Sequence, residues 1–300
     1  TFYPRLSGNY NVTGGTIELA AITNTSAKFQ ILRGSKTYHN LKISGASSNG
    51  GYKGVSNAIV VNNSLNITGT SIFDTDSKSV TGNAGVAMDG GRWRISKLTN
   101  AQPELSGSYA LTGGTIEYYG TTANNNQTIK GGIIYYNIDV NAAAANTNYT
   151  NVDNFYNVSP ASSIEIKGNI NTYSPAVFKI GSTYNISGEG NIFINPGSTL
   201  LYGSAQGIKT SGTIPADGAI RNSGIRSFST DASYGFIGGQ SNMVTGNGIP
   251  AQVENLFIAK FLANLFTAAL VLQKIIPRCP SLEFKKCVKT SNFSSGSTTI

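Results

Sequence analysis

A sequence repeat is the feature that most constrains how this chain of 300 residues can fold. Leu6 to Leu19 has the sequence LSGNYNVTGGTIEL and Leu105 to Tyr118 has LSGSYALTGGTIEY, with ten of fourteen positions identical at an offset of 99. In each copy a polar stretch follows, and then an apolar segment led by asparagine, NLKI from Asn40 and NIDV from Asn137. Repetition of this kind indicates a scaffold of similar units rather than a unique catalytic loop.

Short alternating segments lie between these anchors, each ended within a few residues by glycine, asparagine or proline. In GNIFINPG, Ile192 and Ile194 fall on one face of a strand and Phe193 on the other. Strands this short cannot bury an apolar face alone, but stacked copies form a continuous core. We therefore predict an all-β fold, a right-handed parallel β-helix (β-solenoid), with glycine and asparagine at its corners. A string of β-sandwich domains of about 100 residues each is the alternative.

The predicted β-solenoid covers residues 1–260, in approximate units 4–102, 103–230 and 231–260. Residues 261–300 form an atypical tail that holds both cysteines and only one of the 35 glycines. Within the tail, residues 261–276 predict a helix ended by Pro277, which would be a C-terminal helix of the fold. Its uncharged stretch is twelve residues long, short of the roughly 20 that a span needs, so we predict no stable membrane insertion. A cap on the solenoid and a reading frame shifted after Lys260 remain the alternatives.

The distribution of charge argues against nucleic-acid binding. Charged residues make up 12% of the chain and its net charge is +8. The tail contributes five basic residues and one acidic residue, or +4, and leaves +4 spread over residues 1–260. A phosphate-binding surface requires concentrated positive potential. We therefore predict that nucleic acid is not a partner.

Chemistry-bearing residues are few and scattered. Asp74 and Asp76 in FDTDSK lack the glutamate that a calcium loop requires at its twelfth position, and a solvated turn is the simpler interpretation. The only histidine, His39, aligns with a tyrosine in the second copy of the repeat, which indicates a half-exposed strand position. Glu18 and Glu117 occupy equivalent repeat positions, which favours a ladder role over catalysis. We predict no catalytic residue, cofactor or metal.

The stretch DGGRWR is the strongest candidate for ligand contact. Arg92, Trp93 and Arg94 offer flat guanidinium and indole faces on which a sugar or an acidic glycan could stack. In a strand, however, Arg92 and Arg94 share one face and Trp93 points to the other. Trp93 as a core residue beneath two solvated arginines is therefore the competing interpretation.

Residues 195–260 resemble a block found in adhesin-like repeat proteins that Gram-negative bacteria export by type IX secretion. The matching motifs are Gly207-Ile208, Gly224 to Phe228, Tyr234 to Gly238, and Met243 to Leu256. The resemblance implies a bacterial outer surface or extracellular location, a β-solenoid stalk or adhesin role, and glycans or neighbouring cell surfaces as partners. It carries over no catalytic residue. A polysaccharide-degrading or carbohydrate-binding β-helix protein is the alternative function, and because the chain begins within a repeat we expect it to be a fragment.

Overall fold

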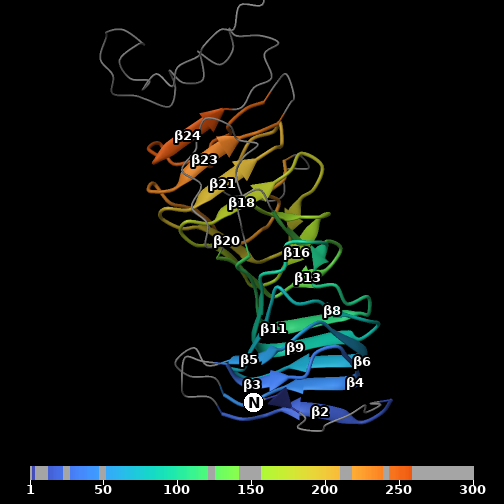
Figure 1. Ribbon diagram of the computed structural model, residues 1–300. Helices are drawn as coiled ribbons and strands as arrows, with labels where there is room; N and C mark the ends of the chain where they lie inside the picture. The colour runs from blue at the N-terminus through green and yellow to red at the C-terminus, as the bar shows by residue number, and fades with distance from the viewer. Residues whose placement is uncertain are drawn as a thin grey trace, which may run out of the picture.

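The computed structural model describes residues 2–3, 13–22, 28–46, 52–120, 126–141, 157–209, 218–238 and 243–258. These residues form strands joined by turns, and no helix occurs among them. The predicted helix at residues 261–276 lies outside the described residues. All strand pairs in the described ranges are parallel, and the rungs stack along one axis (Figure 1). The all-β solenoid prediction is confirmed, while the right-handed sense stays a prediction.

Strands from successive coils form three sheets. The 14-stranded sheet contains β1 (Phe2–Tyr3), β2 (Thr16–Leu19), β3 (Lys28–Leu32), β4 (Lys36–Ile43), β5 (Tyr52–Val55), β6 (Ile59–Ile67), β7 (Ile72–Asp76), β8 (Val80–Thr81), β9 (Gly85–Ile95), β11 (Tyr109–Tyr118), β14 (Asn137–Val140), β17 (Asn169–Thr172), β20 (Asn191–Ile194) and β22 (Arg226–Phe228). The 7-stranded sheet contains β10 (Ala101–Gln102), β12 (Gln127–Ile129), β15 (Val158–Pro160), β18 (Val177–Ile180), β21 (Thr199–Tyr202), β23 (Ser233–Phe236) and β24 (Asn255–Ile258). The 3-stranded sheet contains β13 (Ile134–Tyr135), β16 (Ile164–Ile166) and β19 (Ile186–Ser187).

The core is a set of apolar columns that run along the axis. Register places one such column on β7, β9, β11, β14, β17 and β20, and its members are Phe73, Trp93, Ile116, Ile138, Ile170 and Ile192. All six side chains are buried. Because each rung covers the apolar face of the next, strands of two to eleven residues together build one continuous core.

The two copies of the sequence repeat form the same kind of corner on two different faces of the solenoid. Thr16 pairs with Asn40, and Thr115 pairs with Asn137, so each TIE segment stacks directly under its asparagine-led strand. The asparagine side chains donate to the carbonyl oxygens of Gly15 and Gly114, both at 2.9 Å. These glycines have φ values of 72° and 74°, a left-handed conformation that disfavours a side chain. The repeat is therefore a corner unit, as its sequence predicted.

The asparagine at the second corner begins a hydrogen-bonded ladder. The Asn137 side-chain oxygen accepts from the backbone N–H of Asn169, and the Asn169 oxygen accepts from the amide of Asn191, both at 2.8 Å. The ladder ends where Asn191 accepts from the backbone N–H of Ile225 at 2.8 Å. Each amide thus satisfies polar groups that the turn leaves unpaired, which explains why asparagine is frequent at these positions.

Buried tyrosines close several other corners from inside. Tyr38 and Tyr135, at matching positions in the two repeats, donate to the carbonyl oxygens of Arg33 and Lys130, each five residues earlier in the chain. Tyr118 and Tyr234 make equivalent bonds to backbone carbonyls at 2.8 Å. Burial raises the pKa of the Tyr118, Tyr135 and Tyr234 hydroxyls above the ordinary value of 10.0.

These tyrosines predict loss of stability in alkali. Above pH 10 the unfolded chain releases tyrosine protons that the folded chain keeps, so the free energy of unfolding falls as pH rises, by about 1.4 kcal/mol per pH unit for each such group. Below pH 10 the contribution is fully present. Urea midpoints measured by circular dichroism at a series of pH values should show this decline, and Tyr135→Phe should make it shallower. A midpoint that stays constant from pH 9 to well above pH 10 would contradict the prediction.

Candidate functional site

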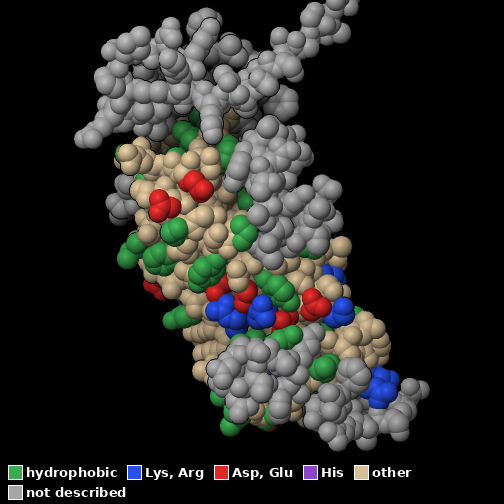
Figure 2. All heavy atoms as spheres, turned by 60° about the vertical axis from the view of Figure 1, so that its left-hand side comes forward, with side chains coloured by type: hydrophobic (Ala, Val, Ile, Leu, Met, Phe, Trp, Pro, Cys, Tyr) green, Lys and Arg blue, Asp and Glu red, His purple; other side chains and the backbone are tan. Residues whose placement is uncertain are grey.

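Charged side chains gather in a band on one outer face of the solenoid (Figure 2). Register stacks Asp74 of β7, Arg94 of β9, Glu117 of β11 and Asp139 of β14 in one outward column, next to the inward column of Trp93. Arg92 lies two residues before Arg94 on β9 and faces the same side. We call Asp74, Arg92, Arg94, Glu117 and Asp139 the charged ladder.

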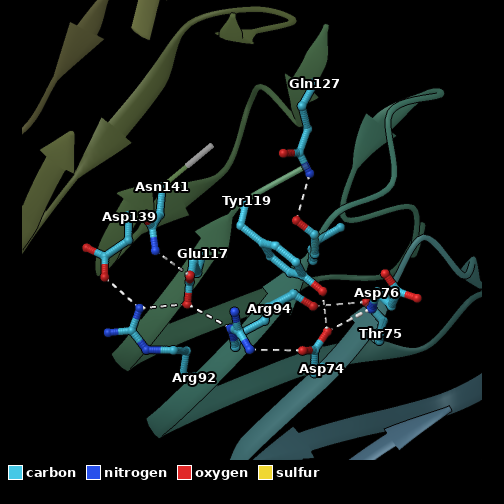
Figure 3. Close-up of polar contacts among 11 residues, drawn as sticks. Asp74, Thr75, Asp76, Arg92, Arg94, Glu117, Tyr119, Gln127, Asp139 and Asn141 are labelled. Carbon is cyan, nitrogen blue, oxygen red and sulfur yellow. Dashed lines mark hydrogen bonds and ion pairs between the residues drawn. The ribbon is translucent and has the colours of Figure 1, made fainter. Parts of the chain in front are cut away.

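The two arginines join the three carboxylates across neighbouring rungs (Figure 3). Arg92 Nη1 lies 2.6 Å from Asp139 Oδ2 and 3.0 Å from Glu117 Oε2. Arg94 reaches Glu117 Oε2 through Nε at 3.1 Å and Asp74 Oδ2 through Nη1 at 3.0 Å. The result is a continuous chain of ion pairs, Asp74–Arg94–Glu117–Arg92–Asp139, which runs along the axis of the solenoid.

Neutral donors occupy the second oxygen of each carboxylate. Tyr119 donates its hydroxyl proton to Asp74 Oδ1 at 2.7 Å (Figure 3). The amides of Asn141 and Asn171 donate to Glu117 Oε1 at 3.0 Å and to Asp139 Oδ1 at 2.9 Å. The Tyr119 ring also lies under Arg94, with the guanidinium carbon 4.6 Å from the ring centre. Every carboxylate of the charged ladder is therefore held from both oxygens.

The carboxylates form the floor of this face and the arginines cover them. The acidic side chains are only 5% exposed, whereas Arg92 and Arg94 are 35% and 27% exposed. Burial by itself would lower the pKa of Arg92, but the hydrogen bond and charge of Asp139, and then those of Glu117, outweigh it and raise the pKa. The surface offered to solvent consists of guanidinium groups, phenol rings and amides rather than acids.

The three residues expected to contact a ligand lie on opposite faces of β9, as the alternation of side chains along a strand requires. Arg92 and Arg94 lie together on the outer face, as the pleat predicts. Trp93 is 1% exposed and packs inside, 6.0 Å from the ring of Phe73, where its indole N–H donates to Thr75 Oγ1 at 3.3 Å. The indole is therefore a core group, and ligand contact at this stretch is left to the arginines.

Two features of the outer face differ from the sequence interpretation. Asp74 lies within β7 rather than in a solvated turn and is 4% exposed, because β9 and Tyr119 cover it. The arginines are ion-paired rather than simply solvated. Glu117 does occupy a ladder position, as does Glu18, which pairs with Lys42 of the next rung at 3.0 Å. The equivalent repeat positions of these two glutamates were the one sequence signal for a ladder.

Other chemically active groups within the described ranges are dispersed. Lys97 and Glu104 form another ion pair at 2.8 Å, in the connection between β9 and β11. No group of three or more metal-ligating side chains occurs in the described part of the chain. His39 is half-buried on β4, the kind of strand position its sequence context predicted. Among the residues that the structure describes, the charged ladder is therefore the most extended network of polar side chains.

Comparison with known proteins identifies no relative, since no family model, curated protein or solved structure matches the chain. Among the residues that the structure places, no helix is long and apolar enough to cross a bilayer.

Proposed function

We propose that this chain is a non-catalytic structural or adhesive segment of a bacterial surface protein, located outside the cell and exported by type IX secretion. The motifs between Gly207 and Leu256 support the export route and location by resemblance. The β-solenoid supports the structural role, because stacked coils make a long, rigid body with repeated outer faces. Glycans or neighbouring cell surfaces are the partners, bound through many weak contacts along those faces.

The ion pairs and hydrogen bonds of the three carboxylates in the charged ladder support a non-catalytic role. A general acid or base must exchange a proton with a substrate within hydrogen-bond reach. In the charged ladder each carboxylate instead accepts from an arginine on one oxygen and from a tyrosine or asparagine on the other. These groups hold the rungs together and present no acid to a bound sugar.

The competing function is a polysaccharide-degrading β-helix enzyme, and one experiment separates the two. The full chain, coupled to beads, is tested for capture of bacterial or host cells, and in parallel it is incubated with acidic and neutral polysaccharides. We expect cell capture above that of beads carrying an unrelated protein, without release of reducing ends or unsaturated products. Turnover of any polysaccharide would overturn the proposal in favour of the enzyme.

A further inference from the structure

The outer face around the charged ladder combines aromatic rings with hydrogen-bond donors in columns along the axis. The backbone N–H of Asn141 donates to the carbonyl of Tyr118, and that of Tyr173 to the carbonyl of Val140, both at 2.9 Å. These bonds place Tyr119, Asn141 and Tyr173 on three successive rungs of one column. At a strand spacing of about 4.8 Å, the two tyrosines lie about 10 Å apart along the axis.

Tyr173 is the most exposed ring of this face and lies beside the charged ladder. It is 39% exposed and follows directly after β17, where Asn171 contacts Asp139. Partial burial raises the pKa of its hydroxyl, as does the negative charge of Asp139, while Arg92 opposes the rise. The phenol thus lies near the Arg92–Asp139 ion pair and leaves part of its ring open to solvent.

The arginines retain donors that the ion pairs do not use. Within the described residues, Arg92 makes both of its contacts through Nη1, and Arg94 makes its contacts through Nε and Nη1. In the part of the chain that the structure describes, the Nη2 groups of both side chains have no acceptor, so their N–H bonds can donate to a ligand. The exposed amide side chain of Asn141 adds a polar group between the two tyrosines.

Charge decides which class of ligand fits. Two guanidinium groups face three carboxylates in the charged ladder, so its formal charge is −1. A polyanion gains no net attraction there, and its own charges would compete with buried carboxylates for the same arginines. An uncharged sugar chain meets neither cost, because its hydroxyl and ring oxygens accept from N–H donors and its apolar ring faces stack on tyrosine.

We propose that this face binds a linear, uncharged polysaccharide that runs along the solenoid axis, with Tyr173 stacking on a sugar ring and the Nη2 groups of Arg92 and Arg94 donating to sugar oxygens. The proposal rests on the adhesive function given above and names its ligand class. The sequence left a sugar and an acidic glycan as alternative ligands, and the charge of this face favours the uncharged sugar. Trp93 takes no part, because it lies in the core.

Affinity electrophoresis of the full chain tests the ligand class. The probes are hydroxyethyl cellulose and laminarin as neutral chains, polygalacturonate as an acidic chain and chitosan as a cationic chain. We expect retardation by at least one neutral probe, unchanged between about 0.05 M and 0.5 M salt because no ion pair with the ligand is involved. Retardation by polygalacturonate or chitosan alone, abolished by salt, would overturn the proposal.

Two tyrosine variants test the location of the site. Tyr173→Ala should weaken binding to the neutral probe about tenfold, the order expected for loss of one stacked ring. Tyr184→Ala is the matched control, since Tyr184 is similarly exposed, at 37%, but precedes β19 on the 3-stranded sheet. Both rings are exposed, so both variants should fold, which circular dichroism checks. Equal effects of the two substitutions, or none from Tyr173→Ala, would contradict the site.

The cell-capture and polysaccharide experiments can fail separately, and each failure tests a different proposal. If the beads capture cells but the chain binds none of the four polysaccharides, the ligand class is wrong and the adhesive function stands. If the chain releases reducing ends from a neutral probe, the adhesive function itself is wrong. Binding of a neutral probe without turnover, weakened by Tyr173→Ala alone, supports both.

Discussion

Arg94→Met should lower the free energy of unfolding by about 3 kcal/mol, because it leaves the buried carboxylate of Asp74 without its cation and Glu117 with only one of its two arginines. Arg94 contacts Asp74 at 3.0 Å and Glu117 at 3.1 Å, and both acidic side chains are only 5% exposed. Methionine retains much of the apolar length of the side chain, so the loss reports mainly on charge and hydrogen bonding. Urea unfolding followed by the fluorescence of Trp93, the only tryptophan, measures the change.

An exposed ion pair in the same chain provides the control. Lys42 and Glu18 also join neighbouring rungs, at 3.0 Å, but both side chains are 40% exposed. Lys42→Met should leave the urea midpoint nearly unchanged, because water solvates the remaining carboxylate. Adding Asp74→Asn to Arg94→Met should restore part of the stability, since it removes the carboxylate that Arg94→Met leaves without a cation, while Glu117 keeps Arg92. Equal effects of Arg94→Met and Lys42→Met would show that the charged ladder contributes no more than a surface pair.

The alternation within strands could be predicted from sequence because it depends only on local geometry. Arg92, Trp93 and Arg94 alternate between the two faces of β9 whatever lies on the next rung. The same holds for Ile192 and Ile194, which are buried, with Phe193 facing outward between them. The corners could be predicted for a different reason, because the glycine-rich segment and the asparagine-led strand that follows it recur in the same order in both copies of the repeat.

The partners of the arginines could not be predicted, because they depend on the length of each coil. Arg94 pairs in register with Asp74, 20 residues before it, and with Glu117, 23 residues after it. The next step, from Glu117 to Asp139, spans 22 residues, but from Asp139 to Asn171 it spans 32. A shift of one residue in the register of β7 or β11 against β9 would place a different side chain opposite Arg94. The repeat predicted a ladder role for Glu117, but only the register revealed which side chains lie beside it.

The repeat offset of 99 residues spans several coils of the solenoid. The rungs recur at roughly a quarter of this offset, so each repeat unit contains several rungs. Thr16–Leu19 stacks on the C-terminal half of β4, while Thr115–Tyr118 follows the Gly113-Gly114 corner and begins the next face. The two copies therefore differ by several coils and one face. Similar sequence therefore marks similar corners on two faces of the solenoid.

Trp93→Ala should destabilise the fold by about 3–5 kcal/mol, the largest effect expected of any single truncation in this core. Trp93 is 1% exposed and is stacked between Phe73 and Ile116 of the adjacent rungs. Removing the indole opens a cavity in the apolar column directly beneath the charged ladder. Thr75 Oγ1 loses the indole donor but still donates to the carbonyl oxygen of Arg94 at 3.2 Å, so the cost comes mainly from lost packing.

Trp93→Phe distinguishes packing from any role of the indole in binding. Phenylalanine refills most of the cavity and should recover more than half of the stability lost in the alanine variant, as measured by urea unfolding with circular dichroism. Because the ring lies inside, Trp93→Phe should also bind the neutral polysaccharide as tightly as the natural chain does. If it folds normally and yet loses that binding, the indole contacts the ligand, and the assignment of the binding face to Tyr173 and the arginines is wrong. We expect stability to decrease with the volume of the side chain at position 93, while Trp93→Phe leaves polysaccharide binding unchanged. This outcome would show that Trp93 acts only in the core, where it helps to fix the spacing of Arg92 and Arg94.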